Sequence, residues 1–374
     1  MNRRPAAQEA ARQQALSRSL VAIARGDRPN ITPALRADPA VFADAVRYHR
    51  LAPLAHVLLR DTEPELAGVL QADRDRARAG HLHVTTLLGH LGDLLDGVAW
   101  VAFKGPVLSE LAHPVPGLRS YQDLDLLVRP EDLREVSRRL AGAGWTIADF
   151  EDMLRNPHLP GEMHWRSPSG LLMDLHWSMI NMAHRRQQLT VPTAALLHRR
   201  EQVPLGFGSA WALDPVDGLL HVCLHAALTG ANKLLYLVDA QRMAARITDW
   251  ELVGARAAEW KVAPHVALVL HRAQRGLGGE LPEDLDRILG STAAFRALTA
   301  AVDRAAPVAA ARTEPGVARL VARAVRPGAV RTTLASAQSV ARYLRERPRP
   351  ARPVRVQAAD GALSLYLERV EAAS

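Results

Sequence analysis

The spacing of apolar residues divides the chain into three regions. From about residue 8 to residue 97, apolar positions recur every three or four residues, which is the period of a helix with one buried face. Prolines such as Pro33 and Pro64 stand where such helices begin. The helical pattern returns from about residue 191 and continues to the end of the chain. Between these two regions the pattern changes.

The middle region alternates short apolar runs with turn residues, as expected for strands separated by short helices. The predicted elements are strands at 98–103, 124–128 and 145–150, helices at 107–112 and 130–143, and a hairpin with arms at 162–166 and 171–177.

These elements together predict an α+β fold, in which a small mixed β-sheet core is flanked by helical regions on both sides. We place the boundaries at residues 1–97 for the N-terminal helical region, 98–190 for the core, and 191–374 for the C-terminal helical region with its Arg-rich tail.

The positive net charge of +8 is concentrated in that tail. Residues 312–355 contain 11 Arg against two acidic residues, so the rest of the chain is close to neutral. A protein that binds nucleic acid along its surface would spread its basic residues more widely. The charge pattern therefore argues against a nucleic-acid partner and favours a basic face exposed to water.

Cysteine usage and apolar segments bear on the compartment. The single cysteine, Cys223, excludes an internal disulfide and fits a reducing environment. The N-terminus lacks the apolar stretch of a signal peptide. No segment approaches the roughly 18–20 apolar residues that a membrane helix needs. We expect a cytoplasmic protein without a membrane partner.

Two aspartates interrupt the strand at 124–128 at its start. Asp123 and Asp125 are one residue apart, so both project from the same face of the strand while Leu124 and Leu126 point to the other. Two carboxylates this close repel each other unless a cation lies between them, and Mg²⁺ prefers carboxylate and phosphate oxygens. For an isolated Asp-x-Asp, a polar sheet face that contacts water is the commoner explanation.

A third carboxylate favours the metal site. In the strand at 171–177, Asp174 and His176 lie on one face, and Met173 and Leu175 lie on the other. If this strand pairs beside Asp123 and Asp125, Asp174 completes the metal site or accepts the proton of an acceptor hydroxyl. The alternative is a buried aspartate that only hydrogen-bonds backbone groups.

Lys104 and Gly105 follow the first strand and lead into a helix. A glycine here lets backbone amides approach a phosphate group, and the lysine adds a positive charge. The alternative is a simple turn between a strand and a helix.

Residues 101–133, VAFKGPVLSELAHPVPGLRSYQDLDLLVRPEDL, resemble an uncharacterised bacterial nucleotidyltransferase family of the polymerase-β-like nucleotidyltransferase superfamily. The family pattern is an apolar strand, Lys-Gly, a short helix, an arginine four residues before the first aspartate, and Asp-x-Asp. The residues that match it in order are Lys104, Gly105, Arg119, Asp123 and Asp125.

The resemblance extends over about residues 40–250. It includes the Asp-Leu-His-Trp sequence that begins at Asp174 and a later segment, LDPVDGLLHVCLHAALTGANKLLYLVDAQRM. Two features depart from the wider superfamily. Its usual Gly-Ser or Gly-Gly turn is replaced by Lys104-Gly105, and the distance along the chain to Asp123 is longer.

The resemblance implies that Asp123, Asp125 and Asp174 are the catalytic, metal-binding acids and that Lys104 and Gly105 face the triphosphate. We expect Arg119 to neutralise negative charge that develops during the reaction. Lys233, in the later helical segment, is a further candidate for nucleotide binding, with an ordinary surface or helix-cap contact as its alternative.

The predicted function is metal-dependent transfer of a nucleoside monophosphate from a nucleoside triphosphate to a hydroxyl or similar acceptor, with release of pyrophosphate. The expected cofactor is Mg²⁺ or Mn²⁺. The acceptor stays open among a small molecule, a peptide and a protein. The alternatives are a tailoring transferase that uses another activated donor, such as a nucleotide sugar, and a non-catalytic nucleotide-binding protein.

Three further residues share one helix face, because Asp217, His221 and His225 are spaced four apart. This spacing is compatible with zinc, but the glutamate of a zinc-protease motif is absent, since Val222 follows His221. We therefore expect a packing or supporting role beside the active site.

Overall fold

The computed structural model describes residues 3–148, 153–206, 208–310, 316–327, 334, 338 and 361–373. The Arg-rich segment 312–355 and the end of the predicted strand 145–150 lie largely outside these residues. Among the described residues, no helix has both the length and the apolar composition that crossing a membrane requires.

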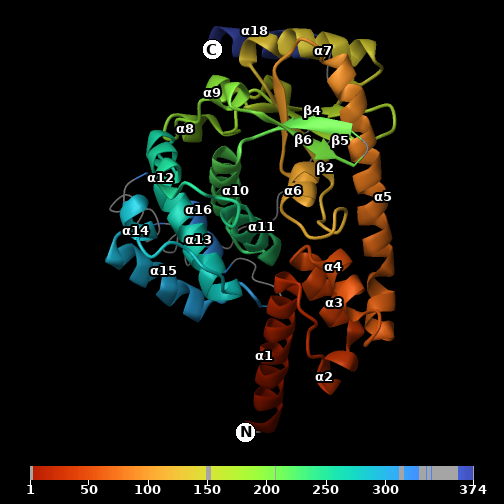
Figure 1. The fold of residues 1–374 in the computed structure, drawn as a ribbon, viewed down its shortest axis with the longest axis vertical. Coiled ribbons are helices and arrows are strands. Elements are labelled where there is room, and N and C mark those ends of the chain that lie inside the picture. The colour runs from red at the N-terminus through yellow and green to blue at the C-terminus, as the bar shows by residue number, and fades with distance from the viewer. Residues whose placement is uncertain are drawn as a thin grey trace.

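The N-terminal region is helical, as predicted. Its helices are α1 (Arg3–Arg25), α2 (Pro33–Arg36), α3 (Pro39–Tyr48), α4 (Ala52–Leu59) and α5 (Pro64–Leu94). Pro33 and Pro64 do begin helices, because a proline in the first turn lacks only an N–H that has no partner within the helix. Helix α5 is continuous over 31 residues and connects the N-terminal helices to the sheet (Figure 1).

Seven strands form one mixed sheet in the order β3-β4-β5-β2-β1-β7-β6. The pairs β2/β5 and β1/β7 are parallel, and the other pairs are antiparallel. The strands are β1 (Trp100–Phe103), β2 (Asp123–Val128), β3 (Thr146–Ile147), β4 (Glu162–Arg166), β5 (Leu172–His176), β6 (Glu201–Leu205) and β7 (Gly208–Ala212). The α+β fold with helical regions on both sides is confirmed.

The hairpin of β6 and β7 corrects the expectation that the chain is helical from residue 191 onwards. Val203 and Leu205 are buried, while Pro204 between them is exposed, which is the two-residue period of a strand. Gly206 has a φ of 55°, which suits a tight turn between the two strands. The hairpin extends the sheet beyond the predicted core.

The two faces of the sheet meet different helices. One face packs against the second half of α5, α7 (Leu133–Gly142) and α18 (Ala362–Ala373) in a shared apolar core. On the other face, Val101, Phe103 and Leu127 join a core formed with the N-terminal helices and with α10 (Pro215–Thr229), α11 (Leu234–Ala244) and α13 (Ala263–Leu277).

The remaining described elements are short connectors and the outer C-terminal helices. They are α6 (Gly105–Leu111), η1 (Pro130–Asp132), η2 (Met153–Arg155), α8 (Ala183–Arg186), α9 (Thr193–His198), α12 (Trp250–Glu259), α14 (Leu285–Ile288), α15 (Ala293–Ala305) and α16 (Val317–Ala324). The chain ends at α18, which lies beside α7 at the end of the molecule opposite α1 (Figure 1).

Candidate active site

The candidate active site lies on the sheet face that carries the polar residues of β2, β4 and β5. In the strand register, Asp125 is the direct neighbour of Asp174 on β5, and Asp174 is the direct neighbour of His164 on β4. Directly paired residues project to the same side of a sheet. Leu124 and Leu126 are buried on the opposite face, so the predicted alternation along β2 is confirmed.

Three side chains on this face are close enough to share a metal ion. One ligand atom from each of Asp125, Asp174 and His176 lies within 4.8 Å of the other two. Asp123 is not part of this group, but burial and then the negative charges of Asp125 and Asp174 raise the pKa of its carboxyl group. The charge of Asp123 therefore interacts with the group, and His176 is the third possible metal ligand.

Lys104 is bound to Asp125, the most buried of the three aspartates on this sheet face. Its Nζ lies 2.5 Å from Asp125 Oδ1, and His176 Nε2 lies 3.2 Å from the same oxygen. Burial alone would raise the pKa of Asp125, but the charge of Lys104 and the hydrogen bond from His176 hold that pKa well below its ordinary value. Burial alone would lower the pKa of Lys104, but Asp125 outweighs it and raises that pKa. The two groups therefore form a charged pair.

Two residues of β4 support the metal-binding group. His164 Nδ1 lies 2.7 Å from Asp174 Oδ1, and Glu162 Oε2 lies 3.3 Å from His176 Nδ1. Asn181 donates a hydrogen bond to the other carboxylate oxygen of Glu162 over 2.5 Å. Glu162 and His164 were not predicted as site residues, although the Glu-Met-His-Trp-Arg alternation of β4 places both on one face.

Gly105 is closely packed at the start of α6. A Cβ atom at this position would lie 3.3 Å from the carbonyl oxygen of Asp123 and 3.3 Å from Cδ2 of Tyr121. Lys104, just before it, has a φ of 61°, a conformation that few residues with a side chain adopt. The Lys104-Gly105 turn therefore fits tightly against the strand that carries the aspartates.

Arg119 is held in a buried ion pair. Its guanidinium donates to both oxygens of Asp239 over 2.8–3.2 Å, and His113 Nε2 lies 2.8 Å from Asp239 Oδ1. The charge of Arg119 and the hydrogen bonds to Asp239 overcome the effect of burial and keep the pKa of Asp239 well below its ordinary value. This contact ties the segment before β2 to α11, and a phosphate contact of Arg119 stays a prediction.

A pocket of about 310 Å³ adjoins the aspartates, because residues 120–122, which lead directly into β2, form part of its wall. Lys233 also lines it, together with Arg50. Asp73 in the same wall pairs with two other lining arginines, at 2.9 and 3.4 Å. The positive charge of Arg50 opposes the rise in the pKa of Asp123, which indicates that the pocket and the aspartates are neighbours. Its positively charged and aromatic lining residues are Arg47, Tyr48, Arg50, Arg76, Tyr121 and Lys233.

The histidines of α10 lie close to Phe103 of β1. The ring of Phe103 packs edge-on against His221, with 4.9 Å between ring centroids, and His225 follows at 6.1 Å from His221. Both ring nitrogens of His221 are buried without a hydrogen-bond partner among the described residues, and burial holds its pKa well below the ordinary value. Asp217 instead pairs with arginines, including Arg199. The expected packing role beside the active site agrees with these contacts.

These observations define an α+β protein with a candidate divalent-metal site on its sheet and a cationic pocket next to it. A family model described as "Uncharacterised nucleotidyltransferase" matches residues 36–278, which is well over half of the chain. The chain belongs to this nucleotidyltransferase family. A search of curated proteins gave no match.

Proposed function

We propose that the protein transfers a nucleoside monophosphate from a nucleoside triphosphate to an acceptor hydroxyl and releases pyrophosphate. The observation that carries this proposal is the group of Asp125, Asp174 and His176, which lies beside the cationic pocket of about 310 Å³. The family supports a nucleotide as substrate. The acceptor is not specified by these features.

The donor set fits a divalent cation of the Mg²⁺ or Mn²⁺ type. Asp125 and Asp174 offer carboxylate oxygens, which hard cations prefer, and His176 offers one imidazole nitrogen. Such an ion, when bound, polarises the α-phosphate and neutralises charge in the transition state. Asp123, whose pKa is raised by burial and then by its acidic neighbours, gains a favourable partner when a cation is present.

The residues of this chain position the two reactants. We assign the triphosphate to the pocket lined by Arg50 and Lys233, because their positive charges attract its phosphate oxygens. Lys104 pairs with Asp125, and its positive charge also attracts the phosphate groups of the substrate. Asp174, supported by His164, accepts the proton of the acceptor hydroxyl.

In this reaction the acceptor oxygen forms a bond to the α-phosphorus as the bond from that phosphorus to the bridging oxygen breaks. Pyrophosphate leaves with the electron pair of the broken bond. The acceptor proton moves to Asp174. The label of an α-labelled triphosphate therefore stays with the product, whereas the label of a γ-labelled triphosphate leaves in pyrophosphate.

The test offers each nucleoside triphosphate, labelled at either the α- or the γ-phosphate, to the full chain with Mg²⁺ or Mn²⁺ and a cell extract. We expect transfer of the α label by the wild type and loss of transfer in Asp125→Asn and Asp174→Asn. Glu131→Gln is the matched control, because Glu131 is an exposed acid in η1, outside the site.

Transfer of the γ label would show a phosphoryl transferase instead and would refute the proposal. Equal α-label transfer by the wild type and by Asp125→Asn would also refute it, because the buried aspartate would then have no part in the reaction. Folding of each variant is checked by its circular dichroism spectrum.

A further inference from the structure

Three side chains form a hydrogen-bonded chain beside the cationic pocket. His81 of α5 lies between Tyr121, in the segment before β2, and Glu110 of α6. Its Nδ1 is 2.7 Å from the hydroxyl oxygen of Tyr121, and its Nε2 is 2.9 Å from Glu110 Oε1. His81 is 6% exposed, so water has little access to its ring. The proposed metal binding and proton transfer do not use these three residues.

The direction of the two hydrogen bonds follows from the groups that form them. An ionised carboxylate only accepts, so Nε2 of His81 carries a hydrogen and donates it to Glu110. In the neutral ring Nδ1 is then an acceptor, and the hydroxyl of Tyr121 donates to it. Burial raises the pKa of Tyr121, so this hydroxyl keeps its proton near neutral pH. Because its proton is shared with His81, the hydroxyl holds the tyrosine side chain in place and does not donate to a phosphate.

Tyr121 contacts two parts of the candidate active site. Its side chain lines the cationic pocket of about 310 Å³. Its ring also packs against the Lys104-Gly105 turn, where a Cβ atom at Gly105 would come within 3.3 Å of ring atom Cδ2. Asp123, the first residue of β2, follows two positions later in the chain. Tyr121 therefore lies where the wall of the pocket meets the turn and the strand that carries the aspartates.

The pocket is built from two parts of the chain that are far apart in the sequence. Arg47 of α3 and Arg76 of α5 line it from the N-terminal helices, and both pair with Asp73 of α5. These side chains of α3 and α5 form the cationic wall of the pocket. Tyr121 lines it from the side of the sheet. His81 lies less than two turns after Arg76 on α5, so its bond to Tyr121 joins the cationic wall to the sheet.

The loop between α6 and β2 packs closely around His81. Gly117 in this loop has a φ of 80°, and a Cβ atom there would lie 3.5 Å from Cβ and Cδ2 of His81. The N–H of Gly117 donates to Ser109 Oγ of α6 over 2.9 Å, and Ser109 is fully buried. The imidazole is therefore held both by its two hydrogen bonds and by the loop.

We propose that His81 and Glu110 are positioning residues for the nucleotide. Through Tyr121 they set the separation between the cationic wall and the sheet face that carries the metal-binding group. This inference rests on the proposed function, because it places the triphosphate in the same pocket. When the bond between Tyr121 and His81 is absent, the cations are still present but are less well placed relative to the metal. Triphosphate binding then weakens, whereas metal binding by Asp125 and Asp174 does not change.

The test measures two affinities of the full chain. The first is the affinity for fluorescent analogues of the ribonucleoside triphosphates with Mg²⁺, and the second is the affinity for Mn²⁺ alone, followed by electron paramagnetic resonance. Tyr121→Phe removes only the hydroxyl, and His81→Phe removes both hydrogen bonds but keeps an aromatic ring. We expect each variant to bind triphosphate about twofold to tenfold more weakly, which is the effect of one lost hydrogen bond, and to bind Mn²⁺ as the wild type does.

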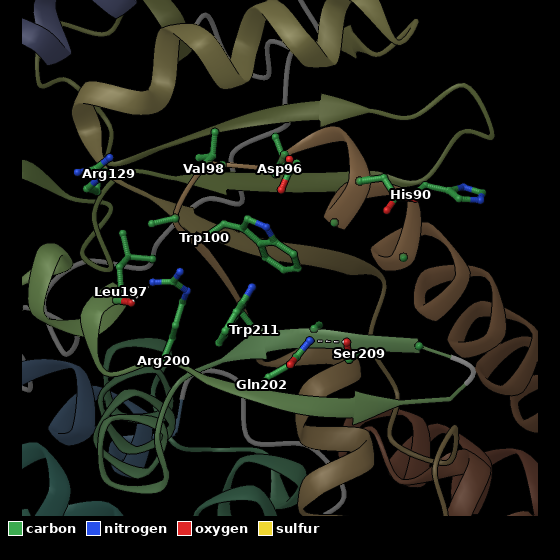
Figure 2. A pocket seen from close by; sticks show the side chains of 18 of the residues that line it. His90, Asp96, Val98, Trp100, Arg129, Leu197, Arg200, Gln202, Ser209 and Trp211 are labelled. Carbon is green, nitrogen blue, oxygen red and sulfur yellow. Dashed lines mark hydrogen bonds between the residues drawn. The ribbon is translucent and has the colours of Figure 1, made fainter.

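Three further variants separate positioning from a general effect on the fold. His81→Asn keeps an acceptor oxygen at the position of Nδ1, so it should bind triphosphate more tightly than His81→Phe does. The double variant of Tyr121→Phe and His81→Phe should bind no more weakly than His81→Phe alone, because both changes break the same bond. His90→Phe is the matched control, because His90 is an exposed histidine of the same helix that lines a separate cleft of about 1170 Å³ (Figure 2). We expect this control to bind both ligands normally.

The inference is overturned if Tyr121→Phe and His81→Phe bind triphosphate as tightly as the wild type, or if their effects add in the double variant. It is also overturned if Mn²⁺ binding falls together with triphosphate binding, because the side chains would then support the fold in general. In each of these cases the wild type still binds triphosphate. A wild type that binds no triphosphate would instead refute the proposed function, and this inference with it.

Discussion

Replacing Lys104 with methionine tests the electrostatic core of the candidate active site. The substitution removes the ammonium group that lies 2.5 Å from Asp125 Oδ1. Methionine keeps an unbranched apolar side chain, so the contact of the stem with its surroundings is largely retained. It also keeps the Cβ atom, so the backbone at φ 61° is no more strained than before.

The expected loss of stability follows from the burial of the pair. Asp125 is 2% exposed, and the side chain of Lys104 is 19% exposed, so both charges are mostly removed from water. Removing one partner of a buried ion pair costs about 3–5 kcal/mol. Because Lys104 keeps some contact with solvent and His176 still reaches Asp125, we expect the lower end, about 3 kcal/mol near neutral pH.

This loss should depend on pH. In the wild type the pKa of Asp125 is held below its ordinary value. Its ionised form therefore stabilises the fold at any pH above the ordinary pKa, and this contribution is lost as the pH falls from there toward the lowered pKa. Without Lys104, burial raises the pKa of Asp125, and ionisation then opposes folding. The difference between wild type and variant should be largest near neutral pH and should shrink as the pH falls toward about 4.

A divalent cation should restore much of the lost stability, because it supplies the positive charge that Lys104 provided. A ligand present at one hundred times its Kd stabilises the folded state by about 2.7 kcal/mol. We therefore expect Mn²⁺ without nucleotide to raise the Tm of Lys104→Met more than that of the wild type.

Thermal unfolding followed by circular dichroism, with and without Mn²⁺ and from acidic to neutral pH, measures these effects. Lys261→Met is the control, because Lys261 is exposed and has the same φ of 61°. Equal losses of Tm in the two variants, or the same Mn²⁺ response in Lys104→Met and the wild type, would refute the reasoning.

Three further substitutions address the surroundings of the site. Gly105→Ala brings a Cβ atom to 3.3 Å from the ring of Tyr121, so titration should show weaker binding of nucleoside triphosphate, with unfolding only slightly affected. Asp239→Asn breaks the buried pair with Arg119, and denaturant unfolding should show a loss of about 3–5 kcal/mol. His221→Phe replaces a buried neutral ring whose pKa is well below the ordinary value. The wild type loses stability as the pH falls below about 6.5, and unfolding at a series of pH values should show a smaller loss in this variant.

The sequence was sufficient to predict strands whose polar and apolar residues alternate. β4 and β5 fall at the predicted hairpin arms, because alternation is a local property that each strand carries by itself. β6 and β7 were missed, since Pro204 and the small residues of β7 give no clear alternation of polar and apolar residues in the sequence. Their place in the sheet depends on contacts with α5 and β1 that are distant in sequence.

The candidate active site, like the sheet, was predictable only as far as the local alternation of polar and apolar residues shows it. Alternation shows that Asp123 and Asp125 share a face, but which of them meets Asp174 depends on the register between β2 and β5, and that register is set by the whole sheet. The pairing of Asp125 with Asp174 brings His176 into the group. Arg119 shows the same limit: its position four residues before Asp123 gives no sign of the carboxylate that its guanidinium meets, which comes from α11, 120 residues later in the chain. Residue type and spacing therefore identify the face on which chemistry occurs, and long-range pairing decides which side chains meet there.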